Sequence, residues 1–93
     1  MEESGYELIV IDKFHFRDGR TVFVGPVMGR IKAIPAGYCD LLVCDQKKVT
    51  IWIHGEEIVE KRKNISYRAV STNDQISIDS SFVSGEWKLV FHQ

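Results

Sequence analysis

Residues 14–32, FHFRDGRTVFVGPVMGRIK, contain two apolar runs joined by a turn and a break after the second run. Asp18 and Gly19 favour the positive φ angles that tight hairpin turns require, and both flanking segments are rich in aromatic or β-branched residues. Gly25 and Pro26 follow, and Pro26 has no N–H group to donate, so we expect a strand edge, bulge or corner there. The stretch predicts the central β-hairpin of an all-β fold.

The rest of the chain repeats this pattern of short apolar runs between turn residues, and helical periodicity is weak throughout. Strands are predicted at residues 6–11, 13–17, 21–24, 27–34, 38–44, 48–54, 66–70, 75–78 and 86–92, with turns at residues 17–20, 35–37, 45–47 and 84–85. Residues 48–54 (KVTIWIH) alternate most cleanly. In this strand the predicted inward side chains are Val49, Ile51 and Ile53, and the predicted outward ones are Lys48, Thr50, Trp52 and His54. Residues 56–64 (EEIVEKRKN) fit a helix and a strand about equally.

Short strands separated by regular turn signals are typical of antiparallel barrels and sandwiches. A chain of 93 residues has room for one hydrophobic core. We therefore expect one all-β domain over residues 1–93, a small closed or partly open antiparallel β-barrel of about six to eight short strands. An open edge strand near either end of the chain predicts a homodimer formed by strand pairing.

The net charge of -1 shows no overall excess of Lys and Arg, which nucleic-acid-binding proteins use to neutralise phosphates. The acidic start of the sequence is unlike a signal peptide, and no stretch approaches the ~20 apolar residues of a membrane span. Cys39 and Cys44 lie in one predicted strand about 16 Å apart, too far for a disulfide. Free thiols and no membrane partner predict a cytoplasmic location.

The order of these features resembles the β-barrel second domain of translational GTPases such as elongation factor Tu. The resemblance covers roughly residues 6–91 and rests on residues 18–22 (DGRTV), Gly25, Gly29, Ile31 and Lys32, the charged segment 56–63 after a strand ending near His54, and residues 76–78. It implies a barrel that, in that family, holds aminoacyl-tRNA and contacts the ribosome. The GxxxxGK[ST] phosphate loop is missing, so the resemblance implies no nucleotide hydrolysis. Residues 34–37 (IPAG) replace the family's Gly-Asp pair, and none of its contact residues is placed here.

The candidate binding residues lie on one predicted strand face and in the charged segment after it. Trp52 stands on the polar side between Thr50 and His54, where an exposed aromatic ring is a frequent anchor for a protein partner. Residues 56–64 could instead cover this ring. Lys61, Arg62 and Lys63 could contact RNA phosphates, but three glutamates precede them, and the mixed charge favours a solvated charged surface. Trp87 is predicted to lie in the core.

No motif predicts catalysis, a metal site or a cofactor. The potential metal ligands or nucleophiles are His15, His54, His92, Cys39, Cys44, Asp40 and Asp45. Their spacing lacks the close pairs, such as C-x₂-C or H-x₃-H, that metal sites use. The sequence therefore predicts a non-enzymatic cytoplasmic binding module with a protein partner, and the alternative is an RNA-binding or translation-associated module.

Overall fold

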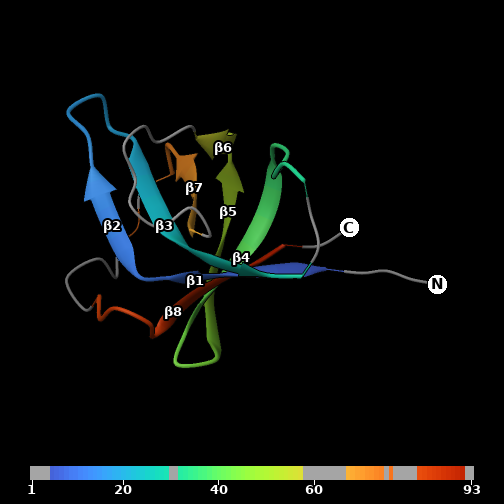
Figure 1. The fold of residues 1–93 in the computed structure, drawn as a ribbon. Helices are drawn as coiled ribbons and strands as arrows, with labels where there is room; N and C mark the ends of the chain where they lie inside the picture. The colour runs from blue at the N-terminus through green and yellow to red at the C-terminus, as the bar shows by residue number, and fades with distance from the viewer. Residues whose placement is uncertain (1–4, 30–31, 58–66, 75, 77–81, 92–93) are drawn as a thin grey trace.

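The computed structural model describes residues 5–29, 32–57, 67–74, 76 and 82–91. The strands are β1 (Tyr6–Val10), β2 (Asp12–His15), β3 (Thr21–Met28), β4 (Gly37–Val43), β5 (Gln46–Ile53), β6 (Gly55–Glu57), β7 (Tyr67–Thr72) and β8 (Trp87–Phe91) (Figure 1). All the regular structure assigned to the described residues is β-strand. The predicted all-β class and the number of strands are confirmed.

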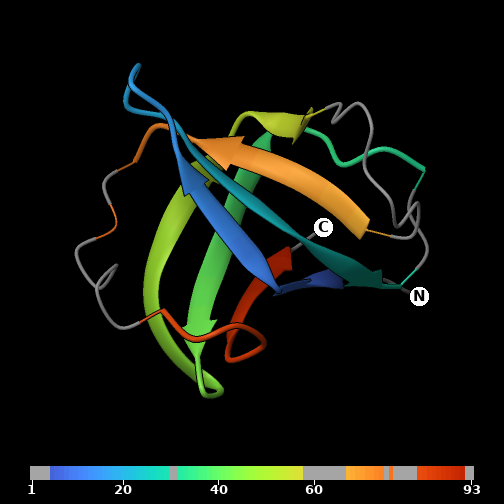
Figure 2. The same ribbon diagram turned by 60° about the vertical axis from the view of Figure 1, so that its left-hand side comes forward.

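The strands form one antiparallel sheet in the order β5-β4-β8-β1-β3-β7-β6, and β2 also pairs with β3. The two ends of this order, β5 and β6, are consecutive in the sequence and are joined through His54. Because β6 pairs with β7 while β5 pairs with β4, the sheet curls back on itself (Figure 2). The fold is a strongly curled, partly open antiparallel barrel, as the sequence predicts.

The chain bends between β1 and β2 while it runs along β3. β1 pairs with the last residues of β3, and β2 pairs with its first half, from Asp12↔Val24 to His15↔Thr21. Gly25 lies at this bend, where a Cβ atom would stand 1.6 Å from the carbonyl oxygen of Ile9. The bend therefore requires glycine, because any side chain would collide with backbone.

The predicted hairpin of residues 14–32 is confirmed at its turn and corrected beyond it. Gly19 has a φ of 93°, and the Asp18 carboxylate accepts a hydrogen bond from the Arg20 N–H at 3.0 Å. Gly25 and Pro26 do not interrupt the strand, since β3 continues to Met28 and Pro26 stands opposite Tyr67. An extended strand accommodates the fixed φ of proline, and Pro26 occupies the last pair with β7.

Other predicted boundaries shift by one or more residues. The predicted strand 27–34 is wrong at Gly29 and at residues 32–34, which are not strand; Gly29 has a φ of 117°, and residues 30–31 lie outside the described residues. The turn predicted at residues 45–47 lies at Cys44 and Asp45, whose φ angles of 51° and 67° match a two-residue hairpin turn. β7 extends to Thr72, beyond the predicted end at residue 70. Of the predicted strand 75–78, only Ile76 is described, and it is buried.

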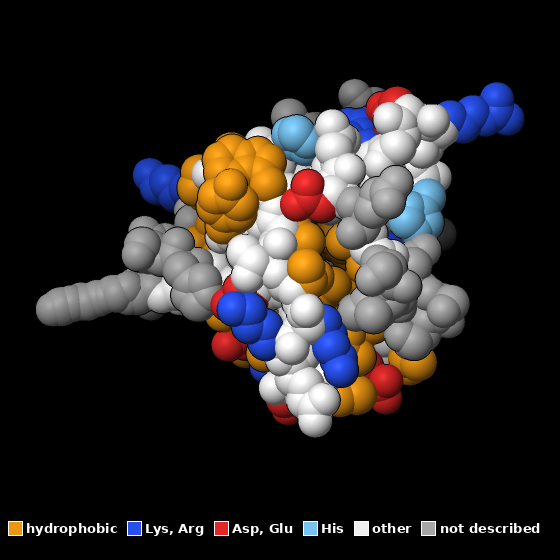
Figure 3. All heavy atoms as spheres, turned by 180° about the vertical axis from the view of Figure 1, so that it is seen from behind, with side chains coloured by type: hydrophobic (Ala, Val, Ile, Leu, Met, Phe, Trp, Pro, Cys, Tyr) orange, Lys and Arg blue, Asp and Glu red, His pale blue; other side chains and the backbone are white. Residues whose placement is uncertain are grey.

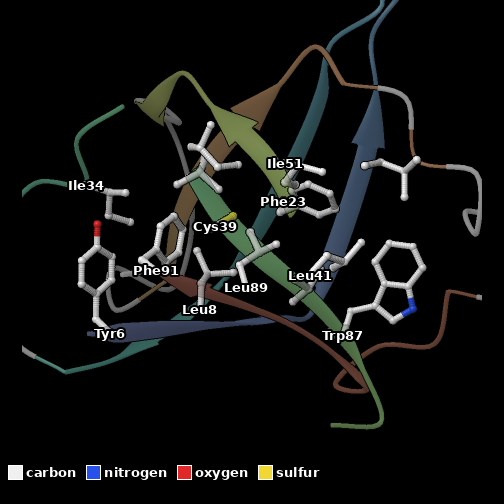
Figure 4. Packing of buried hydrophobic residues seen from close by; sticks show 14 residues of the cluster. Tyr6, Leu8, Phe23, Ile34, Cys39, Leu41, Ile51, Trp87, Leu89 and Phe91 are labelled. Carbon is white, nitrogen blue, oxygen red and sulfur yellow. The ribbon is translucent and has the colours of Figure 1, made fainter. Parts of the chain in front are cut away.

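The core lies inside the curl, and every second residue of β1 and β8 points into it. It contains Tyr6, Leu8, Val10, Phe23, Ile34, Cys39, Leu41, Ile51, Ile53, Val70, Ile76, Trp87, Leu89 and Phe91 (Figure 4). The inward predictions for Ile51 and Ile53 are confirmed, whereas Val49 is 38% exposed, because β5 leaves the core towards its hairpin turn. Trp87 lies in the core as predicted.

The connection between β3 and β4 is fixed by a side-chain ion pair. Arg68 Nε donates to Glu56 Oε2 at 2.7 Å, and Arg68 Nη2 donates to the Lys32 carbonyl oxygen at 2.7 Å. The Ile34 N–H donates to Glu56 Oε1, and the Ile34 carbonyl accepts from the Glu56 N–H. The pKa of Arg68 is raised, chiefly by its hydrogen bond to Glu56, so the pair stays charged. These contacts set the start of β4.

Candidate functional site

Trp52 lies on the outer face of β5, opposite Tyr38 of β4. Its side chain is 38% exposed and that of Tyr38 is 65% exposed. The two rings meet edge to face, with centroids 4.9 Å apart and planes at 76°. Hydrophobic side chains gather on this surface beside histidine and acidic side chains (Figure 3). The question left open by the sequence is answered, because Trp52 is exposed and Tyr38 is its neighbour.

The backbone that carries Trp52 is fixed on the side opposite β4. The Trp52 N–H donates to Asp74 Oδ2 at 2.8 Å, and the Trp52 carbonyl accepts from the Thr72 hydroxyl at 2.6 Å. The same hydroxyl accepts from the Asp74 N–H at 3.0 Å. The His54 N–H then donates to the Ser71 carbonyl, where β7 takes over the pairing. The aromatic pair, Tyr38 and Trp52, therefore stands on hydrogen-bonded backbone.

Thr50 lies on the same outer face as Trp52 and its hydroxyl is engaged by β4. It donates to Asp40 Oδ1 at 2.6 Å, and the same oxygen lies 3.5 Å from Lys47 Nζ. Thr50 thus holds a neighbouring carboxylate beside the aromatic pair. It offers less to a ligand than the sequence prediction assumed, because its donor already has an acceptor.

His54 borders a hollow of about 500 Å³ at the end of β5. The hollow is lined by Asp18, Arg20, His54, Glu57, Ser71 and Asn73. Asp18 and Arg20 lie in the β2–β3 turn, His54 and Glu57 lie between β5 and the end of β6, and Ser71 and Asn73 lie at the end of β7. Gly55, with a φ of 120°, makes the bend that turns β5 into β6 and places His54 at the rim. The hollow and the aromatic pair are therefore adjacent along one strand.

Glu57 is the centre of the hydrogen bonding inside the hollow. The hydroxyl of Ser71, which is fully buried, donates to Glu57 Oε2. Arg20 Nη1 donates to both carboxylate oxygens at 3.3 Å, and the Arg20 guanidinium lies 4.8 Å from the centre of the Phe16 ring. Arg20 Nε is buried and has no hydrogen-bond partner among the described residues, with Asp18 Oδ2 at 3.7 Å. The Arg20 guanidinium is therefore positioned by the Glu57 carboxylate and the Phe16 ring.

Sequence reasoning identified only His54 of this hollow. The sequence places Asp18 and Arg20 in a predicted turn, Ser71 just beyond the predicted strand 66–70, and Glu57 in the charged segment. The lining residues come from three separate parts of the chain, so no local spacing relates them. The pairing of β3 with β7 and of β7 with β6 brings them together, and single-sequence periodicity does not specify strand order.

The basic residues Lys61, Arg62 and Lys63 lie outside the described residues, as does most of segment 56–64. Glu56 and Glu57, which begin that segment, belong to β6 and are strand. The described residues include no group of three or more His, Cys, Asp or Glu side chains placed to hold a metal ion. The basic cluster thus stays a prediction from sequence.

The two cysteines are free thiols in different surroundings. Cys39 is buried in the core, and burial raises its pKa to about 12. Cys44 is exposed in the β4–β5 turn, and its pKa is raised by desolvation and by the neighbouring Glu86 carboxylate. Neither cysteine lines the hollow, so His54 has no thiol partner there.

Within the described ranges, no helix has the length and hydrophobicity that crossing a membrane requires. Comparison of the chain with known protein families, curated proteins and solved structures found no match. The resemblance to the barrel of translational GTPases therefore stays a prediction made from the sequence.

Proposed function

We propose that this chain is a non-enzymatic, cytoplasmic binding module that contacts a protein partner through the Tyr38–Trp52 aromatic pair. The observation that carries the proposal is an exposed edge-to-face pair of rings beside the polar side chains of Thr50, Asp40 and Lys47. Aromatic residues are enriched in protein interfaces, where they bury large areas at low entropic cost. The Trp52 N–H donates to the Asp74 carboxylate and the Trp52 carbonyl accepts from the Thr72 hydroxyl, and these hydrogen bonds hold the ring-bearing strand in place before a partner binds.

The arrangement of the hollow favours binding over catalysis. The Ser71 hydroxyl is fully buried and already donates to Glu57, so it is not accessible to a substrate. The high pKa of Cys39 keeps that thiol protonated at neutral pH. Activated nucleophiles need access and a neighbouring base, and neither residue has this combination.

The experiment is a selection of phage-displayed random peptides on the immobilised protein. Selected peptides are then resynthesised and titrated against the wild type and two variants. Trp52→Ala should weaken binding about tenfold or more, as truncation of an interface anchor does. Phe14→Ala removes a ring of similar exposure on β2 and should leave affinity unchanged. Equal binding by the wild type and Trp52→Ala, with both folded by circular dichroism, would contradict the proposal.

The RNA alternative has a distinct signature. If Lys61, Arg62 and Lys63 contact phosphates, a single-stranded RNA oligonucleotide should bind, and its affinity should fall steeply with salt. Trp52→Ala would then reduce the affinity for RNA less than removal of the three basic charges does.

The homodimer expected from the sequence stays a prediction, and β2 is the edge best suited to it. β2 pairs with β3 on one side, and its neighbouring rings Phe14 and Phe16 are 46% and 44% exposed. Sedimentation of the same preparations at rising concentration tests this, and a constant monomer mass would reject it.

A further inference from the structure

We propose that the hollow beside the aromatic pair receives a positively charged Arg or Lys side chain of the partner. This inference rests on the proposed protein-binding function and assigns the partner's chemistry. The bound segment would be extended and would carry an apolar residue over Trp52 and Tyr38, with a basic residue two positions away in the hollow.

The end of β5 next to His54 is acidic. Among the described residues, the carboxylates of Asp18 and Glu57 and the guanidinium of Arg20 line the hollow, and the Asp74 carboxylate accepts a hydrogen bond from the Trp52 N–H, two residues before His54. Three negative charges and one positive charge leave a net of -2 when His54 is neutral. A local negative potential favours cations over anions, and it does so more strongly in a recess than on a flat surface.

Arg20 is bonded closely by the Glu57 carboxylate, whereas its ion pair with Asp18 is longer and more exposed. Arg20 shares its Nη1 atom between the two oxygens of Glu57 and rests on Phe16. The Asp18 side chain is 62% exposed, and its Oδ2 lies 3.7 Å from Arg20 Nε, beyond hydrogen-bond distance. That oxygen can therefore accept a hydrogen bond from a ligand, and a carboxylate pairs most effectively with a guanidinium or ammonium group.

The spacing along β5 specifies how the two contacts are combined. Trp52 lies in β5 and His54 directly follows the last residue of this strand, so the two are two residues apart, which is about 7 Å along an extended chain. An extended peptide lying along this face places its own alternate side chains at the same interval. One side chain can therefore meet the aromatic pair while the next on that side enters the hollow. This geometry predicts the pattern apolar–x–basic or its reverse.

The test uses two synthetic tripeptides, acetyl-Phe-Ser-Arg-amide and acetyl-Phe-Ser-citrulline-amide. Citrulline has nearly the shape of arginine but no charge. Titration of the ¹⁵N-labelled protein should show tighter binding of the arginine peptide by about fivefold, as expected for a few exposed charge contacts. The backbone resonances of His54 and Asn73 should shift with the arginine peptide, and added salt should reduce the difference.

A double variant, Asp18→Asn with Asp74→Asn, removes two charges and keeps the acceptor oxygens that bond to the Arg20 and Trp52 N–H groups. It should lower affinity for the arginine peptide about fivefold and leave the citrulline peptide unaffected. Asp45→Asn is the matched control, because Asp45 is 81% exposed in the distant β4–β5 turn and asparagine tolerates its positive φ.

The outcomes separate this inference from the function on which it rests. Equal affinity for the two tripeptides, or an unchanged double variant, would overturn the cation-receiving hollow while leaving the aromatic contact standing. If Trp52→Ala no longer binds either tripeptide, the aromatic contact is supported. If Trp52→Ala binds the arginine peptide as tightly as the wild type does, and still more tightly than the citrulline peptide, the cation-receiving hollow is supported and the proposed aromatic contact is contradicted. Failure of both peptides to bind at millimolar concentration overturns both.

Discussion

The protein has two tryptophans in opposite surroundings, Trp87 inside the curl and Trp52 outside it. Trp87 is fully buried on β8, with Phe82 and Phe23 at ring distances of 5.1 and 6.4 Å. Lys13 Nζ lies 5.6 Å from its ring, and burial lowers the pKa of that lysine. Trp52 has one ring neighbour, Tyr38, and stands partly in solvent. The comparison separates a region that holds the fold from a region available to a partner.

The largest expected effect is on the buried side of this comparison. Trp87→Ala should lower the free energy of unfolding by about 3–5 kcal/mol, because it leaves a cavity in a packed core. Trp52→Ala should lower it by less than about 1 kcal/mol, since an exposed ring has little to lose. Urea denaturation followed by circular dichroism measures both. Similar losses for the two variants would break the division between fold and surface.

Two glycines sharpen the same division. Gly25→Ala should destabilise the protein by about 2–3 kcal/mol, because the new Cβ would meet the Ile9 carbonyl oxygen at the bend. Gly37→Ala, next to Tyr38 at the start of β4, is the matched control. A Cβ there meets no described atom within 4 Å, and the change should stay within about 0.5 kcal/mol. Thermal unfolding measures both changes in stability. If Gly25→Ala is as stable as the wild type, the backbone at the bend can relax to accept a side chain.

The smallest expected effect concerns the pH dependence of the core. Burial raises the pKa of Cys39 from 9.0 to about 12, so above pH 9 the unfolded chain loses this proton before the folded one. Stability is therefore lost as pH rises from about 9 towards 12, by up to ~1.4 kcal/mol per pH unit for this thiol. Between pH 9 and pH 10, the wild type should lose about 1 kcal/mol more than Cys39→Ala.

The measurement is urea denaturation of both proteins at several pH values, and the readout is the difference in slope. The variant's own cavity lowers its stability equally at each pH and does not affect that slope. Parallel profiles would mean that Cys39 is ionised in the folded protein or is never exposed by unfolding. Exposed Cys44 provides a second check, because it should react with a thiol reagent in the native state while Cys39 should not.

Local sequence patterns predicted what local chemistry controls. Sequence patterns placed Trp87, Ile51 and Ile53 inside and Trp52 outside, and the Asp18–Gly19 pair indicated the first hairpin. The same reasoning was wrong where neighbours in space decide the outcome. Pro26 stays within β3 because it falls at the end of the β7 pairing, and Val49 is exposed because β5 extends beyond the core.

The candidate site could be predicted only in part, for the same physical reason. Trp52 lies in β5 and His54 directly follows it, so alternation in the predicted strand 48–54 puts both side chains on the outward side. Tyr38 joins Trp52 through the register of β4 with β5, and Glu57 meets Arg20 through the strand order around the curl. Register and strand order depend on the whole sheet, and a single sequence does not specify them.

The position of β8 has a consequence for how the chain acquires its structure. This strand, residues Trp87–Phe91, lies between β1 and β4 and hydrogen-bonds to both. During synthesis, β1 and β4 are therefore complete long before β8, the strand that pairs with both of them. Until it arrives, the sheet has two unsatisfied inner edges and the core lacks its largest ring. Such distant pairings are expected to make refolding slow, on the order of milliseconds to seconds.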